Sequence, residues 1–199
     1  MRIVADLYEM VIIGGGPAGL AAALYAARAR RKTVVLERDT PGGKASSIER
    51  IEDYPGFPDG IAGQDLGTAM ADQAARFGAE IRVEEVLGVD LRQRIKRVQT
   101  SRGEYDALVV ILATGAVAGS DGAWEFPYPE LPPNSALVNG QLPMDNRGYL
   151  ACNEWMETEL HGVFVAGDVR QESAHQVVTA AGDGATAAIA ADRYLSEEH

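Results

Sequence analysis

The sequence predicts an α/β fold, with a mainly parallel sheet flanked by helices and a small three-stranded antiparallel meander on one side. Three observations predict it. A buried strand, a glycine-rich turn, a helix and a second buried strand follow one another over residues 7–37, which is one βαβ unit. Three short strands with polar turns fill residues 85–112. A further apolar strand and an alanine-rich helix occupy residues 162–168 and 182–195.

The first unit begins with an apolar, β-branched run at residues 7–13 (LYEMVII). Residues 20–30 are rich in alanine and leucine and predict a helix, with Pro17 in its opening turn. Residues 33–37 (TVVLE) predict the second strand. The two strands are expected to pair in parallel, with a right-handed crossover.

The elements after this unit alternate between loops, helices and strands. Residues 39–63 are rich in glycine and proline and predict a loop, and residues 116–143, with five of the nine prolines, predict a linker or a place where a segment is missing. Between them we expect a helix over residues 64–77, stopped by Gly78, and a strand over residues 79–83. The three meander strands follow at residues 85–91, 95–101 and 104–112, and the last of them runs on to Thr114 and Gly115.

Composition limits the kinds of protein and partner. The 199 residues, 46% of them hydrophobic, suffice for a single domain over 1–199, and the net charge of −11 argues against a general binder of nucleic acid or anionic membrane. Neither an apolar run of roughly 18 residues nor a signal-peptide layout is present, so we expect no membrane span and a cytoplasmic location.

Cysteine and histidine usage excludes several kinds of chemistry. The single cysteine, Cys152, rules out a disulfide or a CxxC pair within this chain, and we interpret it as an ordinary small residue at a helix start. His161, His175 and His199 lack the spacing of metal ligands or of a catalytic triad. We therefore predict no metal site and no catalytic residue.

The glycines of the first turn carry the main functional signal. Gly14, Gly16 and Gly19 have G-x-G-x-x-G spacing, and Glu37 ends the next strand. These glycines allow a tight turn, close approach of a pyrophosphate, and close packing of helix on strand. An acid at the end of the second strand binds ribose hydroxyls and disfavours a 2′-phosphate. The pattern predicts a dinucleotide site without separating NAD from FAD; a glycine-rich turn without a ligand is the alternative.

A second glycine pattern is expected to be accidental. Gly182, Gly184 and Ala187 fit G-x-G-x-x-A, but residues 176–181 do not predict a strand that would open a second βαβ unit.

Several motifs together resemble the flavin domain of bacterial thioredoxin reductases. They are GGGPAGLAAALYAARA, VVLE, PGGK, IEDYPGFP, GIAG, FGAE, LATG, VFVAGDV and TAAGDGATAA, in the order of the family. The resemblance covers nearly the whole chain outside residues 116–131. It implies a Rossmann-like domain that binds FAD.

The resemblance also implies which residues meet the cofactor. The turn would hold the pyrophosphate, Glu37 the adenosine ribose, Val86 the adenine, Asp168 the ribitol, and Gln176 with the last helix the pyrimidine edge. Lys44 and Asp53 put charges where the family has amides near the isoalloxazine. The full predicted set is Gly14, Gly16, Pro17, Ala18, Gly19, Glu37, Arg38, Gly43, Lys44, Asp53, Val86, Ala113, Thr114, Gly115, Gly167, Asp168, His175, Gln176 and Val177.

Structural alternatives stand beside these roles. Asp168 could cap a turn, Lys44 and Asp53 could be solvated loop charges, Gln176 could act through its backbone, and Thr114–Gly115 could only shape a strand end.

The resemblance shows what this chain lacks. Members of the family carry an inserted NADPH domain with a CxxC disulfide, and here residues 116–131 bridge that position. We expect an FAD-binding module without disulfide reductase activity, an engineered or reconstructed minimal domain. The alternatives are an oxidoreductase with another electron donor and a structural or dimerisation module. A homodimer through the flavin domain is expected, unless the bridging aromatics Trp124, Phe126 and Tyr128 cover the exposed surface.

Overall fold

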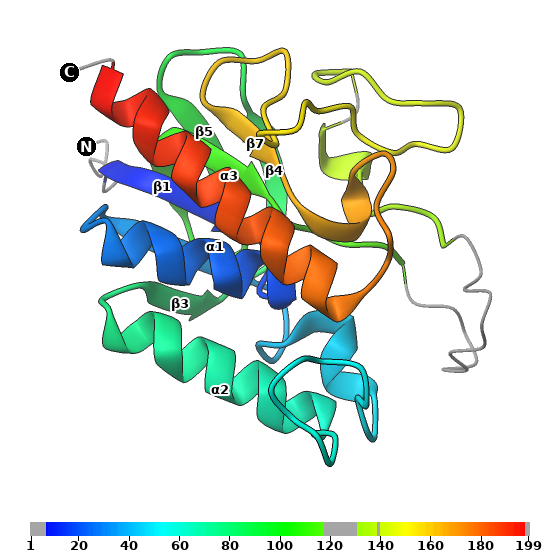
Figure 1. Ribbon diagram of the computed structural model, residues 1–199. Helices are drawn as coiled ribbons and strands as arrows, with labels where there is room; N and C mark the ends of the chain where they lie inside the picture. The colour runs from blue at the N-terminus through cyan, green and yellow to red at the C-terminus, as the bar shows by residue number, and fades with distance from the viewer. Residues whose placement is uncertain (1–6, 118–130, 139, 198–199) are drawn as a thin grey trace.

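The computed structural model describes residues 7–117, 131–138 and 140–197, and it confirms the α/β fold (Figure 1). A seven-stranded sheet has the order β3-β2-β1-β6-β5-β4, with β7 also paired to β6. The strands are β1 (Leu7–Ile13), β2 (Thr33–Glu37), β3 (Glu80–Val83), β4 (Val86–Asp90), β5 (Lys96–Thr100), β6 (Glu104–Leu112) and β7 (Val163–Val165). The helices are α1 (Pro17–Arg28), α2 (Gly63–Arg76) and α3 (Val177–Glu197), with short 3₁₀ helices η1 (Gly43–Ser47), η2 (Ala136–Val138) and η3 (Gly167–Val169).

Strand β6 belongs to both parts of the sheet. One edge pairs in parallel with β1. Its other edge pairs antiparallel with β5 over residues 104–107 and parallel with β7 over residues 110–112. The meander is therefore confirmed, but it is not an appendage beside the parallel sheet, because its third strand lies at the centre of that sheet.

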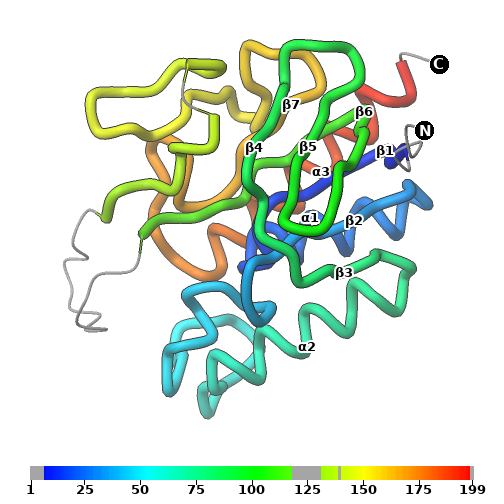
Figure 2. Tube along the Cα trace, turned by 180° about the vertical axis from the view of Figure 1, so that it is seen from behind, coloured from blue at the N-terminus to red at the C-terminus, as the bar shows by residue number. Residues whose placement is uncertain are grey.

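The sheet is covered on both faces, which explains why its central strands are continuously apolar. On β1, Met10 and Ile12 pack against the helices, whereas Val11 and Ile13 pack toward the meander. Figure 1 shows α1 and α3 side by side in front of the sheet, and Figure 2 shows the β4–β5 ribbon from behind.

Helix α3 begins at Val177, five residues before the predicted start. The glycines at 182 and 184 suggested a later start, but both lie inside the helix. A Cβ on Gly184 would lie 1.9 Å from the carbonyl oxygen of Ala18, so this glycine lets α3 press onto α1. The G-x-G-x-x-A pattern is thus helical, and residues 176–181 form no strand, as expected.

The segment 131–143 is more ordered than the predicted linker, within its described residues. Val138 and Leu142 are buried against the meander face of the sheet. The side chain of Gln141 accepts a hydrogen bond from the Leu91 amide at 2.9 Å and donates one to the Val89 carbonyl at 2.8 Å. Its pairing with backbone at the end of β4 explains the order, which proline content alone did not indicate. Trp124, Phe126 and Tyr128 lie outside the described residues.

We predict opposite effects of two alanine substitutions in α3. Gly184→Ala should lower the free energy of unfolding by about 1–3 kcal/mol, because the new methyl group overpacks the contact with α1. Gly182→Ala, which meets no atom within 4 Å, should raise it by about 0.5–1 kcal/mol through helix propensity. Urea denaturation of both variants measures the difference, and equal effects would contradict the close approach of α1 and α3.

Candidate functional site

The predicted site lies where the sheet reverses its order of growth. β1 has β2 on one side, reached through α1, and β6 on the other. Ligands of such open α/β sheets bind outside the carboxyl ends of the strands at this switch point. The turn after Ile13, the end of β6 and the end of β7 all meet there.

The turn itself is formed by close contacts between backbone atoms. Gly14 has a φ of +104°, and a Cβ on it would lie 2.3 Å from the carbonyl oxygen of Ala113. A Cβ on Gly19 would lie 1.8 Å from the carbonyl oxygen of Gly14. Gly16 differs, since the nearest atom to its added Cβ is the Gly43 Cα at 3.8 Å, and the space beside it is open.

Gly16 also forms the N-cap of α1. It makes no side-chain capping hydrogen bond, and Pro17 is the first helical residue. The first N–H groups of a helix have no partner within the helix and carry the positive end of its dipole. An open glycine in front of them suits an anionic group such as a pyrophosphate.

Glu37 stabilises the turn from the end of β2. One carboxylate oxygen accepts a hydrogen bond from the Gly15 amide at 2.6 Å, and the other accepts one from the Asp39 amide at 3.0 Å. The predicted ribose acid therefore lies beside the fingerprint, and it positions the turn as well.

The segment after β2 brings Gly43 and Lys44 to the turn. A Cβ on Gly43 would lie 2.9 Å from the Gly16 Cα. Lys44 is half-buried, and its burial lowers the pKa of the amine, while Asp168 acts in the opposite direction. Because Lys44 is half-buried, it is not a purely solvated loop charge.

Asp168 and His175 lie together after β7. Gly167 and Asp168 begin η3, and a Cβ on Gly167 would lie 2.9 Å from the Ala18 Cβ. The Asp168 carboxylate accepts a hydrogen bond from the Ser173 hydroxyl at 3.2 Å, and the His175 Nδ1 lies 3.7 Å away. Asp168 thus contributes to a local turn and also faces basic groups.

A buried ion pair, which the sequence analysis missed, supports this turn. Arg170 donates to both carboxylate oxygens of Asp183, at 2.6 and 3.0 Å, and Asp183 also accepts from the Gly167 amide at 3.2 Å. The hydrogen bonds to Asp183 raise the pKa of Arg170. The detectable signal was an acidic residue on the face of α3 that is otherwise lined by buried alanines.

The end of β6 is tied to the returning chain at a neck, which we define as residues 114–117 and 132–134. Thr114 donates its hydroxyl to the Asn134 carbonyl at 2.7 Å, and the Asn134 amide donates to the Thr114 carbonyl at 3.0 Å. Ala116 and Pro133 form an antiparallel bridge. Thr114 and Gly115 therefore join two segments and do more than end a strand.

The remaining predicted residues are less closely connected. Within the described part of the chain, neither Arg38 nor Asp53 makes a hydrogen bond or ion pair with the turn; Arg38 pairs with Asp39, and Asp53 is exposed in a loop. Val86 begins β4. The Gln176 carbonyl accepts a hydrogen bond from the Ala180 amide at 2.9 Å, so its backbone joins the first turn of α3, which begins at Val177.

Cys152 has a different setting from the predicted one. It lies half-buried in an irregular segment before β7 and not at a helix start. Burial raises the pKa of its thiol, and Arg170 acts in the opposite direction.

Among the described residues, no three histidine, cysteine or acidic side chains gather as metal ligands. In the same part of the chain, no helix is long and apolar enough to cross a bilayer.

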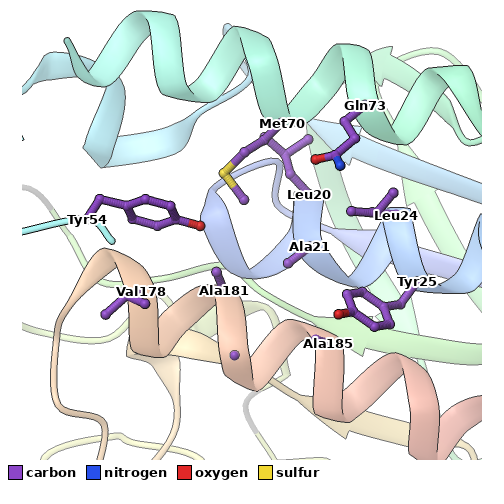
Figure 3. Close-up of a pocket in the computed structure, with 11 residues that line it drawn as sticks. Leu20, Ala21, Leu24, Tyr25, Tyr54, Met70, Gln73, Val178, Ala181 and Ala185 are labelled. Atoms are coloured by element: carbon purple, nitrogen blue, oxygen red, sulfur yellow. The ribbon is translucent and has the colours of Figure 1, made fainter. Parts of the chain in front are cut away.

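An apolar groove of about 330 Å³ lies between α1, α2 and α3. Figure 3 shows Leu20 and Leu24 of α1, Met70 of α2 and Val178 of α3 around it, with Tyr54 at one end. Its lining is mostly apolar, with Gln73 as the amide, and it lacks charged residues, so it does not suit a dinucleotide.

Comparisons with known proteins agree with this geometry. The model of the pyridine nucleotide-disulphide oxidoreductase family matches residues 8–123 and 131–184. The thioredoxin reductase of Peptoclostridium litorale is 29% identical, in an alignment that spans 96% of this chain and 98% of the relative. A thioredoxin reductase structure from Gloeobacter violaceus superposes with a TM-score of 0.86 at 26% identity, covering 96% of each chain.

The alignments also show a difference in length. The Peptoclostridium litorale alignment extends over 309 positions, 110 more than the 199 residues of this chain. The bifunctional thioredoxin reductase/thioredoxin of Mycobacterium leprae is 49% identical over 110 residues, which are 55% of this chain and 24% of that protein.

We predict that the Arg170–Asp183 pair stabilises the turn after β7. Arg170→Met should lower the free energy of unfolding by about 3–5 kcal/mol, because it leaves the buried Asp183 carboxylate unpaired. Arg38→Met, which removes an exposed ion pair, should change it by less than about 1 kcal/mol. Chemical denaturation of the two apoproteins tests this, and a small effect of Arg170→Met would mean that solvent reaches Asp183.

Proposed function

This chain belongs to the pyridine nucleotide-disulphide oxidoreductase family, and from that premise we propose that it is a thioredoxin-reductase-like module that binds FAD. The observation that carries the proposal is the turn after β1. Its open glycine, Gly16, precedes an uncapped helix N-terminus, and three other segments of the sheet end beside it. These features fit a dinucleotide pyrophosphate.

Each predicted residue then has a proposed part in holding the cofactor. Gly14–Gly19 would bind the pyrophosphate, Glu37 the adenosine ribose and Asp168 the ribitol, while the start of α3 faces the flavin. Gly43, Ala113 and Gly167 pack against the turn and position it. The outer contacts proposed are Arg38, Lys44, Asp53, Val86, Thr114, Gly115, His175, Gln176 and Val177.

Bound FAD supplies electron and hydride transfer, which no side chain provides. Reduction of a protein disulfide by the family's route also needs a dithiol, and this chain has one cysteine. We propose that residues 1–199 form one FAD domain and that 116–131 bridge the place of the family's NADPH domain. The 110 extra alignment positions and the closed neck support this arrangement.

An oxidoreductase with another electron donor is the second candidate. The side chains of Asp168 and His175 are 23% and 26% exposed, so solvent reaches part of the proposed flavin side. Stopped-flow oxidation of the reduced protein by small acceptors tests this candidate, and only slow, unspecific reoxidation by oxygen would count against it.

A homodimer is also proposed, with the groove between α1, α2 and α3 as its contact face. Tyr25 and Val178 are 38% and 39% exposed at this groove, and Figure 3 shows both beside it. Contiguous apolar surface of this kind marks protein interfaces.

We predict that purified protein has a flavin spectrum and releases FAD in near one-to-one ratio. Gly16→Ala and Gly16→Val should weaken FAD binding in that order, the valine variant at least tenfold, or about 1.4 kcal/mol. Added atoms fill the open space before α1, yet the extended backbone of Gly16 accepts any residue. Fluorescence titration measures the affinity.

Gly88→Ala is the control for this series, since Gly88 lies on β4 and its added Cβ meets only Gln99 at 3.7 Å. A folded, colourless wild-type protein that takes up no added FAD would overturn the proposed function.

We predict that Ala181→Glu abolishes the dimer, because it places a charge inside the apolar groove. Leu87→Glu, on the exposed β4 strand of the opposite face, should leave it intact. Sedimentation velocity over a wide concentration range measures both, and a wild-type protein that is monomeric throughout would refute the dimer.

A further inference from the structure

The loop between η3 and α3 holds a histidine in a constrained position. His175 has a φ of +52°, which is uncommon for a residue with a side chain, and Glu172 in the same loop has +56°. The His175 amide donates to the Ser173 hydroxyl at 3.2 Å. A ring held in this way, next to the first turn of α3, keeps a defined position relative to any ligand at that helix end.

Asp168 and Tyr149 lie beside the His175 ring, and Lys44 interacts with Asp168. Asp168 of η3 lies 3.7 Å from its Nδ1. The Tyr149 ring packs edge-on against it, with centroids 5.9 Å apart, and the Tyr149 hydroxyl donates to the Leu131 carbonyl at 2.9 Å. On η1, Lys44 interacts with the same Asp168. Asp168 therefore interacts with two basic side chains, and histidine is the residue type of the two that serves as a charge switch near physiological pH.

We propose that His175 is a positioning residue that tunes the flavin by taking up a proton when the cofactor becomes negatively charged. The proposal rests on FAD binding as proposed above. Protonated His175 neutralises Asp168 and adds positive charge at the N-terminus of α3, where the helix dipole already favours an anion. Neutral His175 leaves the Asp168 carboxylate to be balanced by Lys44 alone, which disfavours a second negative charge.

The proton balance follows directly. A chemical reductant such as dithionite delivers two electrons, and the solvent supplies one proton to the cofactor, which then carries one added negative charge. His175 takes a second proton from solvent. By reciprocity, protonation of His175 must favour reduction by the same factor by which reduction favours protonation.

The test is the midpoint potential of FAD bound to the wild-type protein relative to that of FAD bound to His175→Asn, measured by dye equilibration between about pH 5 and 8. The wild-type potential should rise relative to that of the variant as the pH falls, by about 30 mV for a tenfold change in the ratio of affinities for reduced and oxidised FAD. Asparagine suits this reference because it tolerates the positive φ. His175→Lys should keep the higher potential at every pH of the range.

Two controls separate other sources of pH dependence. His161→Asn changes an exposed histidine before β7 and should retain the wild-type profile. Lys44→Gln should lower the potential at all pH values but retain its dependence on pH. Circular dichroism melting shows that each variant is folded.

A second readout uses the wild-type protein alone. The imidazole signals of His175, followed by NMR at one fixed pH within the range, should shift toward those of the protonated ring when the protein is reduced. Unchanged signals, or equal potential profiles for the wild-type protein and His175→Asn, would overturn this inference while FAD binding stands. A colourless protein that takes up no FAD would overturn both.

Discussion

The fold depends on glycines around the turn after β1, because the backbone packs there too closely to leave room for a Cβ. The carbonyl oxygen of Gly14 occupies the space of a Cβ on Gly19, and Ala113 occupies that of a Cβ on Gly14. Because interiors are packed like crystals, even one added methyl group would displace these segments. Two further approaches, by Gly43 and Gly184, fix η1 and α3 against the same turn. The carboxyl ends of β1, β6 and β7 and the start of α1 therefore converge on one point.

Charged groups then divide into two kinds around this point. Glu37 and the Arg170–Asp183 pair bond to backbone amides at Gly15 and Gly167, and so stabilise the shape of the turns. Lys44 and His175 instead face Asp168, at the exposed side of the same site. The carboxylates of the first kind are already used in hydrogen bonds to the backbone. The second kind are basic groups that interact with a carboxylate side chain instead.

Local signals in the sequence predicted the strands and helices well. The apolar runs of β1, β2 and β6 are buried on both faces. A continuous apolar run predicts a buried strand whichever elements pack against it. The start of α3 was missed because glycine signals a helix end locally, whereas Gly184 is there for contact with α1. Gln141 and Asp183 were missed for a related reason, since their partners lie outside their own segments, 50 and 13 positions away in the sequence. The G-x-G-x-x-G motif and Glu37 were found because one βαβ unit contains both.

The neck joins two segments that lie far apart in the sequence at the end of β6. Thr114 and Asn134 exchange hydrogen bonds, and Ala116 pairs with Pro133, so the two segments hold each other. The turn contacts Ala113, which comes before this closure. Val117 and Pro132 therefore meet at a hydrogen-bonded junction, since the Val117 amide also donates to the Pro132 carbonyl at 2.7 Å. Two chain segments that lie this close together are typical of places where a domain insertion is tolerated.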